Sequence, residues 1–448
     1  MAGVEEVDVV VVGLGPGGEN AAGLLAEAGL EVTAVEAGLV GGECPYYGCV
    51  PTKMMVRAAD ALGEARRVPR FAGRAEVVPD LGVPARRVRQ EATDDWNDKA
   101  AADRLTGKGV TLVRGYGVLT GPREVTVGDR VFRGRRGVLL NPGTEPAVPP
   151  IDGLADTPFW TNRDAVKATE APASLVVLGG GAIGVELAQV FARFGSDVTV
   201  VEGGERLVGP LEPEAGDLLR EVFEAEGITV HTGAKASRVT HDGAGFTLEF
   251  AGGRATGERL LVATGRRTDL ERLGVASAGL DPRARTIPVD GRMRAADGLW
   301  AIGDVTGEGA FTHVSMYQSA IAVRDILGQD GPEADYHALP HVTFTDPEIG
   351  GIGVTEAKAR AAGRPVRVTL TPIGESTRGW IHEAPGFIKL VADGEHLVGA
   401  TVAAPYAGEI MGFLALAIQA RVPLHTLKHM IYAYPTFHRA IETAVATL

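Results

Sequence analysis

The chain has 448 residues, of which 45% are hydrophobic and 23% are charged, and its formal net charge is −13 at pH 7. This length exceeds one hydrophobic core and predicts about three domains. The negative charge argues against nucleic acid or an anionic membrane as a partner. With no basic leader and no long apolar run, the sequence predicts neither export nor membrane insertion and favours a cytoplasmic protein.

The N-terminal region has the pattern of a nucleotide-binding βαβ unit. It comprises a strand, a glycine turn, a helix, a second strand and an acid, at Val9–Val12, Gly13–Gly18, Glu19–Ala28, Glu31–Val35 and Glu36. In such a unit Gly13 permits the tight turn, Gly15 lets a pyrophosphate approach the backbone, and Gly18 lets the helix pack on the strand. Glu36 is then the candidate partner of a ribose hydroxyl.

The only two cysteines of the chain, Cys44 and Cys49, follow this unit within the segment Gly41–Lys53. Two thiols this close cannot link distant parts of a fold, so the sequence predicts a redox-active pair and not a structural disulfide. Two buried apolar thiols are the less favoured alternative. A zinc site is less favoured still, because no second Cys or His pair lies nearby at ligand spacing, and no metal site is predicted.

A second βαβ pattern follows about 165 residues later. Its strand, glycine turn, helix, second strand and acid fall at Leu175–Leu178, Gly179–Gly184, Val185–Phe194, Asp197–Val201 and Glu202. Gly179, Gly181 and Gly184 are the candidate cofactor-binding glycines. Two such units imply two dinucleotides, FAD in the first and a nicotinamide cofactor in the second. The Glu202 carboxylate would repel a 2′-phosphate, which favours NADH over NADPH, although Arg206 lies close enough in sequence to bind such a phosphate.

These features resemble the pyridine nucleotide-disulfide oxidoreductases, the family of dihydrolipoamide dehydrogenase, glutathione reductase and mercuric reductase. Beyond the cysteine block, the resemblance rests on four segments: Leu261–Arg266, Trp300–Val305, Phe344–Gly350 and Gly386–Leu390. It implies an α/β fold with two Rossmann-like domains and a C-terminal α+β dimerisation domain. The implied boundaries are 1–149 and 269–330 for the FAD parts, 150–268 for the NAD part and 331–448 for dimerisation. It also implies a homodimer whose active sites are completed by the partner subunit.

The resemblance assigns roles to several side chains. Cys49 is expected nearer the flavin and Cys44 is expected to exchange with substrate. Pro51 is predicted as the first residue of a helix that lowers the pKa of the Cys49 thiol. Lys53 is expected near flavin N5, paired with Glu186. The other cofactor-binding candidates implied by the resemblance are Asp304, for the ribityl chain, and Gly42, Gly117 and Gly265.

Two segments depart from the family pattern. Asn141-Pro142-Gly143-Thr144 stands where relatives have Ala-Thr-Gly-Ser. Near the C-terminus, Tyr434 occupies the position of the general base His, and Arg439 that of its orienting Glu. A tyrosine titrates near pH ~10 and cannot replace an imidazole at neutral pH. His438 and Glu442 are spaced to form a displaced pair on a helix, and a plain surface pair is the alternative.

The predicted function is an NADH-dependent flavoprotein disulfide reductase acting on an unidentified small-molecule or protein disulfide. A diaphorase or quinone reductase is the main alternative, favoured by the missing base and disfavoured by the retained cysteines. Mercuric ion reduction fits the core motifs, but this sequence ends without the cysteine pair that would deliver the metal. A non-enzymatic alternative is a flavin-bound redox sensor whose disulfide controls a partner.

Overall fold

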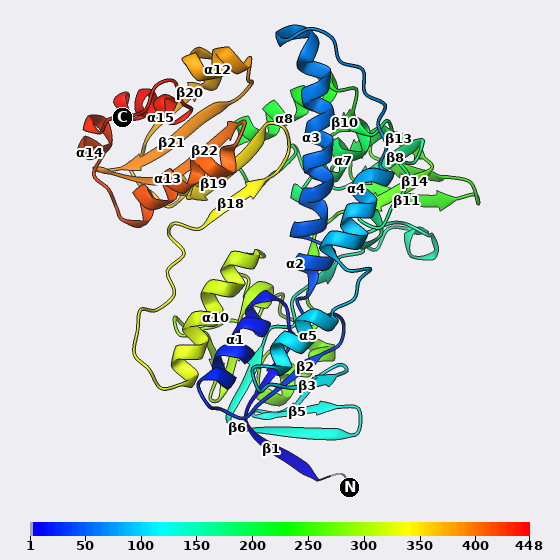
Figure 1. Cartoon of the computed structure of the whole chain (residues 1–448), viewed down its shortest axis with the longest axis vertical. Coiled ribbons are helices and arrows are strands. Elements are labelled where there is room, and N and C mark those ends of the chain that lie inside the picture. Colours follow the sequence, from blue (N-terminus) through cyan, green and yellow to red (C-terminus); the bar gives the residue numbers. More distant parts are fainter. Residues whose placement is uncertain (1–2) are drawn as a thin grey trace. The chain divides into compact units, whose positions relative to one another are not determined.

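The computed structural model describes residues 3–448, and these form two compact units, each built from several segments (Figure 1). The first unit contains the N-terminal segment through Thr52, Ala85–Ala147 and Arg266–Asp335. The second contains Lys53–Pro84, Val148–Gly265 and Tyr336–Leu448. Within these residues no helix has the length and apolar character needed to cross a bilayer.

An eight-stranded sheet organises the first unit, and its central path runs β16-β17-β6-β1-β2-β3. Strands β6, β1, β2 and β3 pair in parallel, as does β17 with β6. The elements are β1 Val4–Val12, α1 Pro16–Glu27, β2 Val32–Glu36, α2 Glu43–Tyr46, a π-helix Val88–Ala92, α5 Lys99–Thr106, β3 Thr111–Arg114, β4 Val118–Gly121, β5 Glu124–Val127, β6 Arg130–Leu140, β7 Glu145–Pro146, β15 Arg266–Arg267, α9 Leu270–Leu273, β16 Arg294–Ala296, β17 Leu299–Ala301 and α10 Thr312–Ile326. Helices α3 (Cys49–Phe71) and α4 (Gly82–Arg87) belong partly to each unit.

The first βαβ unit is confirmed as β1, α1 and β2, with shifted ends. Helix α1 begins at Pro16, three residues before the predicted start at Glu19. Proline suits the first turn of a helix, because its nitrogen has no hydrogen to leave unpaired there and its φ is already helical. Strand β1 is buried over its last four valines, which pack into the cores on both faces of the sheet.

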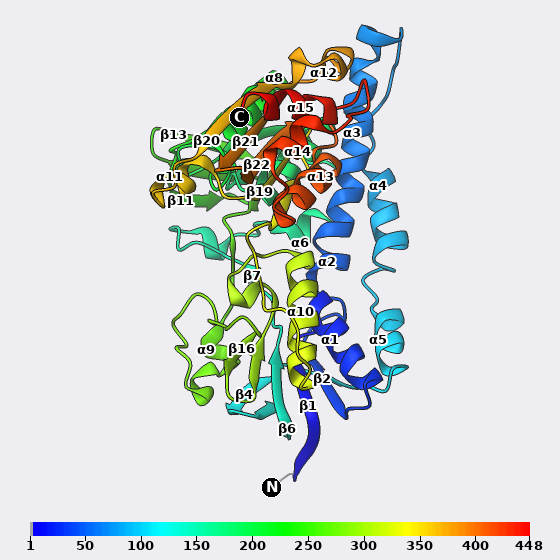
Figure 2. The same cartoon turned by 90° about the vertical axis from the view of Figure 1, so that its left-hand side faces the viewer.

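Helices α1 and α10 lie side by side in both cartoon views (Figures 1 and 2). They meet at Gly17, where an added β-carbon would lie 2.2 Å from Ser315 Oγ. Asn20 of α1 also donates a hydrogen bond to Ser319 of α10 at 2.9 Å. Only glycine allows this approach, so the glycine turn positions α10 as well as α1.

The second unit contains a four-stranded parallel sheet in the order β10-β9-β8-β14, a three-stranded antiparallel sheet and a C-terminal five-stranded antiparallel sheet. Its elements are α6 Asn162–Ala165, β8 Ser174–Leu178, α7 Ala182–Arg193, β9 Asp197–Val201, α8 Pro213–Ala225, β10 Thr229–His231, β11 Ala236–His241, β12 Phe246–Phe250, β13 Gly253–Gly257, β14 Arg259–Val262, β18 Pro340–Thr343, β19 Glu348–Gly353, α11 Glu356–Ala361, β20 Arg367–Pro372, α12 Thr377–His382, β21 Phe387–Asp393, β22 His396–Ala404, α13 Ala407–Gln419, α14 Leu424–His429 and α15 His438–Ala446. The second βαβ unit, β8-α7-β9, is thereby confirmed, and α7 begins three residues before the predicted start.

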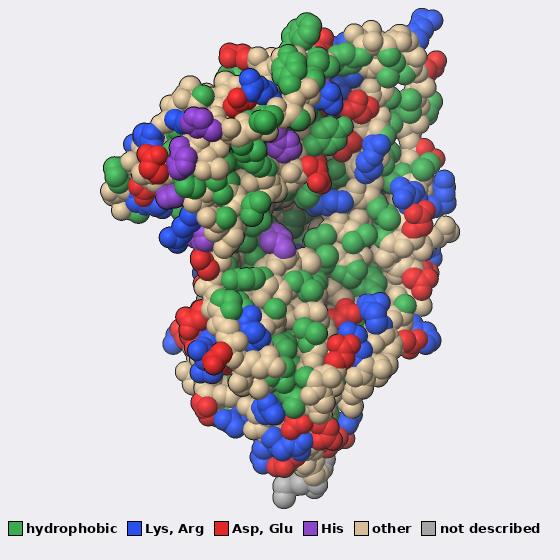
Figure 3. Space-filling model, turned by 60° about the vertical axis from the view of Figure 1, so that its left-hand side comes forward, with side chains coloured by type: hydrophobic (Ala, Val, Ile, Leu, Met, Phe, Trp, Pro, Cys, Tyr) green, Lys and Arg blue, Asp and Glu red, His purple; other side chains and the backbone are tan. Residues whose placement is uncertain are grey.

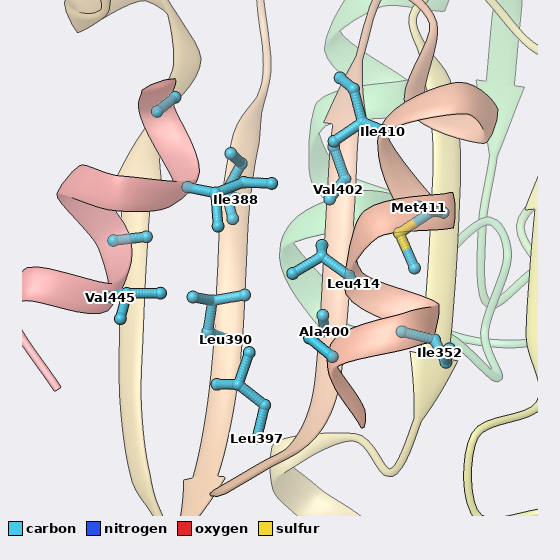
Figure 4. Close-up of a cluster of buried hydrophobic side chains, with 14 of the residues drawn as sticks. Ile352, Ile388, Leu390, Leu397, Ala400, Val402, Ile410, Met411, Leu414 and Val445 are labelled. Carbon is cyan, nitrogen blue, oxygen red and sulfur yellow. The ribbon is translucent and has the colours of Figure 1, made fainter. Parts of the chain in front are cut away.

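The C-terminal sheet has the order β18-β19-β22-β21-β20 and packs against helices α13 and α15. Figure 4 shows Leu414 and Ile410 of α13 beside Val402 of β22, and Val445 of α15 facing Leu390 of β21. These side chains belong to one buried apolar cluster, so the last hundred residues have a hydrophobic core of their own. The predicted class, two Rossmann-like units and a C-terminal α+β portion, is confirmed.

Candidate active site

The first glycine turn leaves the N-terminus of α1 open to an anion. Gly13 has φ +88°, and a β-carbon there would lie 2.2 Å from the Asn141 carbonyl oxygen, so no other residue fits the turn. The helix is capped by Gly15, which supplies no side-chain hydrogen bond. Backbone N–H groups at such a terminus, with the helix dipole behind them, bind phosphates. The turn therefore fits a dinucleotide pyrophosphate.

Glu36 lies at the end of β2 and holds the same turn in place. Its carboxylate accepts the Leu14 N–H and the Gly38 N–H, each at 2.6 Å. Burial raises the pKa of the Glu36 carboxyl and these bonds oppose that rise. The Glu36 carboxylate thus has a fixed orientation beside the glycine turn, as expected for the predicted partner of a ribose hydroxyl.

The second glycine turn repeats this arrangement. Glu202 accepts the Gly180 N–H and the Gly204 N–H, each at 2.5 Å. Gly181 caps α7 without a side-chain bond, and a β-carbon at Gly181 would meet no atom within 4 Å. A β-carbon at Gly184 would lie 2.1 Å from the Gly179 carbonyl oxygen, which explains the close helix–strand packing. This turn also presents free backbone donors beside an oriented acid.

Asp304 begins a polar chain that reaches the cysteine segment. The Thr144 hydroxyl donates to Asp304 at 2.7 Å, and Arg266 donates to the Thr144 hydroxyl and carbonyl oxygens at 2.7 and 2.5 Å. Arg266 also lies 3.6 Å from the carboxylate of Glu43, the residue before Cys44. Thr144, from the atypical 141–144 turn, therefore orients the predicted ribityl-binding acid.

The three other glycines proposed as cofactor-binding differ in how constrained they are. Gly42 has φ +67°, and a β-carbon there would lie 2.8 Å from the Gly15 α-carbon. A β-carbon at Gly117 would lie 3.1 Å from a Val12 methyl group. Gly265 has φ +114° and open space around it. Gly42 thus lies against the first glycine turn, as a residue lining a dinucleotide would.

Cys44 lies in the short helix α2 and Cys49 is the first residue of α3, so the two thiols flank the break between these helices. The helix begins two residues before the predicted start, and Pro51 is its third residue and not its first. The first turn of a helix still tolerates proline. The Cys49 sulfur lies 3.6 Å from the hydroxyl of Thr312, the first residue of α10. The pKa of the Cys44 thiol is raised, mainly by its hydrogen bond with the Cys49 thiol and secondly by burial, while a hydrogen bond from Thr312 opposes the rise.

This raised pKa predicts a pH dependence for Cys44. A thiol reacts as its thiolate, so alkylation of Cys44 by iodoacetamide should keep accelerating at pH values where an ordinary thiol has already reached its plateau. Cys49→Ala removes the side-chain hydrogen bond that raises the Cys44 pKa most and should move the alkylation profile to lower pH. Mass spectrometry of the reduced protein, alkylated at a series of pH values, measures both profiles. A wild-type profile that levels off like that of a free thiol would contradict the raised pKa.

Lys53 lies one turn after Cys49 along α3 and forms the pairing that the resemblance implied. Its Nζ donates to Glu186 at 2.7 Å, and Glu186 is buried in α7. The other Glu186 oxygen accepts the Phe344 N–H at 2.9 Å, and the Phe344 ring centroid lies 4.7 Å from Lys53 Nζ. An ammonium group over an aromatic face makes an attractive contact, so Phe344 and Glu186 together fix the position of the Lys53 side chain.

The displaced pair predicted near the C-terminus does not form. Glu442 pairs with Arg439, and the His438 ring packs edge-on against Phe413 at 5.9 Å. Both Arg439 and His438 can reach Glu442 along one face of a helix, at spacings of three and four residues, but the guanidinium is charged at every pH and binds a carboxylate more strongly. Tyr434, in the position of the expected base, is 69% exposed and its hydroxyl lies 3.0 Å from that of Thr377.

A cavity of about 320 Å³ lies in the first unit, lined by helices α1, α5 and α10 and the turn after α5. Its lining mixes apolar and polar side chains: Pro16, Glu19, Asn20, Arg104, Leu105, Lys108 and Met316. Met316 lies one helical turn after Thr312, and a β-carbon at Gly41 would come within 3.9 Å of the Glu19 carboxylate. The cavity is large enough for a small organic molecule.

Sequence reasoning missed Thr312, Thr144 and Phe344. Thr312 stands at the start of a helix soon after the Asp304 segment, and this position is the one sequence signal that could have identified it. Among residues 3–448 no group of three or more His, Cys, Asp or Glu side chains is arranged to hold a metal ion.

Comparisons with known proteins agree on one family. The family model described as pyridine nucleotide-disulphide oxidoreductase matches residues 7–321, and the dimerisation-domain model of that family matches residues 339–445. A dihydrolipoyl dehydrogenase of Thermus scotoductus is 35% identical over 98% of this chain and 97% of its own length. A mercuric reductase of Acidithiobacillus ferrooxidans is 33% identical over 99% of this chain and 83% of its own length. The Cu(II) complex of the HOCl-induced flavoprotein disulfide reductase RclA from Escherichia coli superposes with a TM-score of 0.87 and 25% identity, over 99% of this chain and 100% of that one.

Proposed function

This chain belongs to the pyridine nucleotide-disulphide oxidoreductase family, and from that membership we propose that it reduces a disulfide substrate at the expense of NADH, with Cys44 and Cys49 as its redox-active pair. Members are NAD(P)H-dependent flavoprotein disulfide oxidoreductases with FAD as the resident cofactor. The observation that carries the proposal is the pair of thiols flanking the α2–α3 break, both in hydrogen-bonding reach of the Thr312 hydroxyl.

The residues present fit both dinucleotides. The open N-terminus of α1, Glu36 and Asp304 would hold FAD, and the open N-terminus of α7 with Glu202 would hold the nicotinamide cofactor. When bound, FAD supplies the two-electron link between the nicotinamide and the cysteine pair. Lys53, held in place by Glu186 and Phe344, would place its ammonium group near the flavin ring.

The chain's own part of the reaction is thiol–disulfide exchange. The Cys44 thiolate attacks one sulfur of the substrate and releases the first thiol product. Cys49 then attacks Cys44, releases the second product and re-forms the Cys44–Cys49 disulfide. NADH and one proton are consumed for each disulfide reduced to two thiols. Thr312 can hydrogen-bond either sulfur and so stabilise whichever is the thiolate.

Thiol counting tests this proposal directly. The oxidised holoenzyme, held under anaerobic conditions, should show no accessible thiol toward a chromogenic disulfide after denaturation, and two after stoichiometric NADH. Because the chain has no other cysteine, the count needs no correction. Two thiols both before and after NADH would exclude the redox-active pair while leaving family membership intact.

Direct reduction of a quinone is the second candidate, and the C-terminal segment favours it. Glu442 is engaged by Arg439, and Tyr434 stands where a general base is expected. Transfer of electrons from a flavin to a quinone needs no thiol base, so it would survive these changes. The cavity of about 320 Å³ in the first unit, with Met316, Leu105 and Pro16 on its wall, is a candidate site for such an acceptor.

We expect NADH to give a higher kcat/KM than NADPH. The Glu202 carboxylate is held at the mouth of the second turn by two N–H groups and cannot swing away from a 2′-phosphate. Glu202→Ala should narrow the preference by about tenfold, which corresponds to ~1.4 kcal/mol of repulsion. Steady-state kinetics with both cofactors measure the change. A wild-type preference for NADPH would overturn the assignment and point to Arg206.

We also propose that the protein works as a homodimer formed through the segment that matches the dimerisation-domain model. Large apolar side chains in this segment are exposed, and Figure 3 shows such side chains on the surface of the upper part of the molecule. The most exposed are Ile431, Trp380, Tyr434 and Leu416. Burial of these side chains against a second copy of the chain would remove their apolar surface from water.

A further inference from the structure

Asn141 is a buried polar residue that the family pattern does not call for. It follows β6, is 5% exposed, and stands where the resemblance implies alanine. Burying an amide without hydrogen bonds is unfavourable, so a buried asparagine needs partners for both ends of its side chain.

The neighbours of the Asn141 amide determine its orientation, because its two ends have nearly the same shape. The nitrogen faces Ser315 Oγ at 3.1 Å and the Ile302 carbonyl oxygen at 3.2 Å, and the oxygen faces the Gly18 N–H at 3.1 Å. The side chain therefore bonds to the first turn of α1, to α10 and to the residue after β17.

These three segments are the ones that the proposed function assigns to FAD. Gly18 belongs to the glycine turn, Ile302 lies two residues before Asp304, and Ser315 lies where α10 touches Gly17. Gly15, the N-cap residue of α1, has no side chain to accept a hydrogen bond, and the oxygen of Asn141, which follows β6, accepts the Gly18 N–H instead. The backbone N–H of Asn141 also donates to the Val12 carbonyl at 2.7 Å, which fixes the residue against β1.

We propose that Asn141 is a positioning residue for FAD, which holds the pyrophosphate-binding turn and the Asp304 segment at their binding distance before the cofactor arrives. The inference rests on the proposed placement of FAD at the first βαβ unit. Alanine at this position would leave the Gly18 N–H, the Ile302 carbonyl and Ser315 without this shared partner, so the segments would have to be ordered by FAD itself. Ordering on binding weakens affinity.

FAD affinity of the apoprotein tests this. Asn141→Ala should raise the Kd for FAD, followed by quenching of FAD fluorescence, by about tenfold or more, since roughly two or three hydrogen bonds are lost. The increase in Tm on adding FAD should shrink accordingly, because ligand stabilisation depends on affinity. Asn162→Ala is the matched control: Asn162 is also 5% exposed but lies in α6 of the other unit, and its loss should lower both Tm values without changing the Kd.

Asn141→Asp gives a second test that does not depend on the alanine variant folding. Its carboxyl group keeps an acceptor for Gly18 but faces the Ile302 carbonyl, so it fits only when protonated. FAD affinity of this variant should therefore rise as pH falls, while the wild type stays flat over the same range. An unchanged Kd in Asn141→Ala, or a flat profile in Asn141→Asp, would overturn the inference. Failure of the wild type to bind FAD would instead overturn the proposed function.

Discussion

Replacing Cys44 with serine is expected to lower turnover with disulfide substrates by about a thousandfold or more, while NADH-dependent quinone reduction stays within about twofold of wild type. Serine is nearly the same size but is not a nucleophile at neutral pH, so the exchange step loses its attacking group. Reduction of the flavin by NADH involves neither sulfur. Stopped-flow measurement of flavin reduction and steady-state assays with a disulfide and a quinone separate the two outcomes.

Cys49→Ser should have a different signature. A thiolate at the first turn of α3 is expected to give a long-wavelength charge-transfer absorbance with the flavin after two-electron reduction. Cys49→Ser should abolish that band, and Cys44→Ser should leave it. A band that survives Cys49→Ser would reverse the roles of the two sulfurs. Equal losses of disulfide and quinone activity in Cys44→Ser would show that the substitution damages the fold.

The parts of the site that could be predicted from sequence are those built from neighbouring residues. Each glycine turn and its acid belong to a pattern of strand, turn, helix and second strand that spans 28 residues, and the observed helices begin only three residues early. The sequence pattern places Pro16 in the glycine turn, whereas in the structure Pro16 is the first residue of α1, a position that accommodates proline. Both acids lie where the pattern places them, at the ends of β2 and β9.

The parts that could not be predicted depend on contacts between distant residues. Thr312 reaches Cys49 across 263 residues, and Thr144 reaches Asp304 across 160. No local pattern specifies such pairs. Phe344 approaches Lys53 because two segments far apart in the chain pack together. The spacing of His438 and Glu442 is correct for a helix, but sequence spacing alone cannot decide whether His438 or Arg439 pairs with the Glu442 carboxylate.

That competition leads to an expected gain of function. Tyr434→His with Arg439→Glu should raise the rate of disulfide exchange by about a hundredfold, the contribution typical of a well-placed general base. An imidazole at position 434 supplies the type of side chain that most often acts as a general base. Removing Arg439 also releases Glu442, and the new carboxylate stands where relatives carry the one that orients the base.

A control variant distinguishes two possibilities for Tyr434: that it merely occupies the position of the base, or that its hydroxyl takes part in the exchange reaction. Tyr434→Phe keeps the ring and removes the hydroxyl that contacts Thr377. If Tyr434 is only a replacement for the base, this variant should retain the wild-type rate of exchange within about threefold, far less than the hundredfold that a base contributes. A hundredfold loss in Tyr434→Phe would show that the hydroxyl itself donates or accepts a proton.

No gain in the double variant, with the cysteine pair still reducible by NADH, would mean that exchange is limited by something other than a base. The exposed position of Tyr434 then becomes relevant, because in a homodimer that side chain would be presented to the partner subunit and its effect would appear only in the dimer.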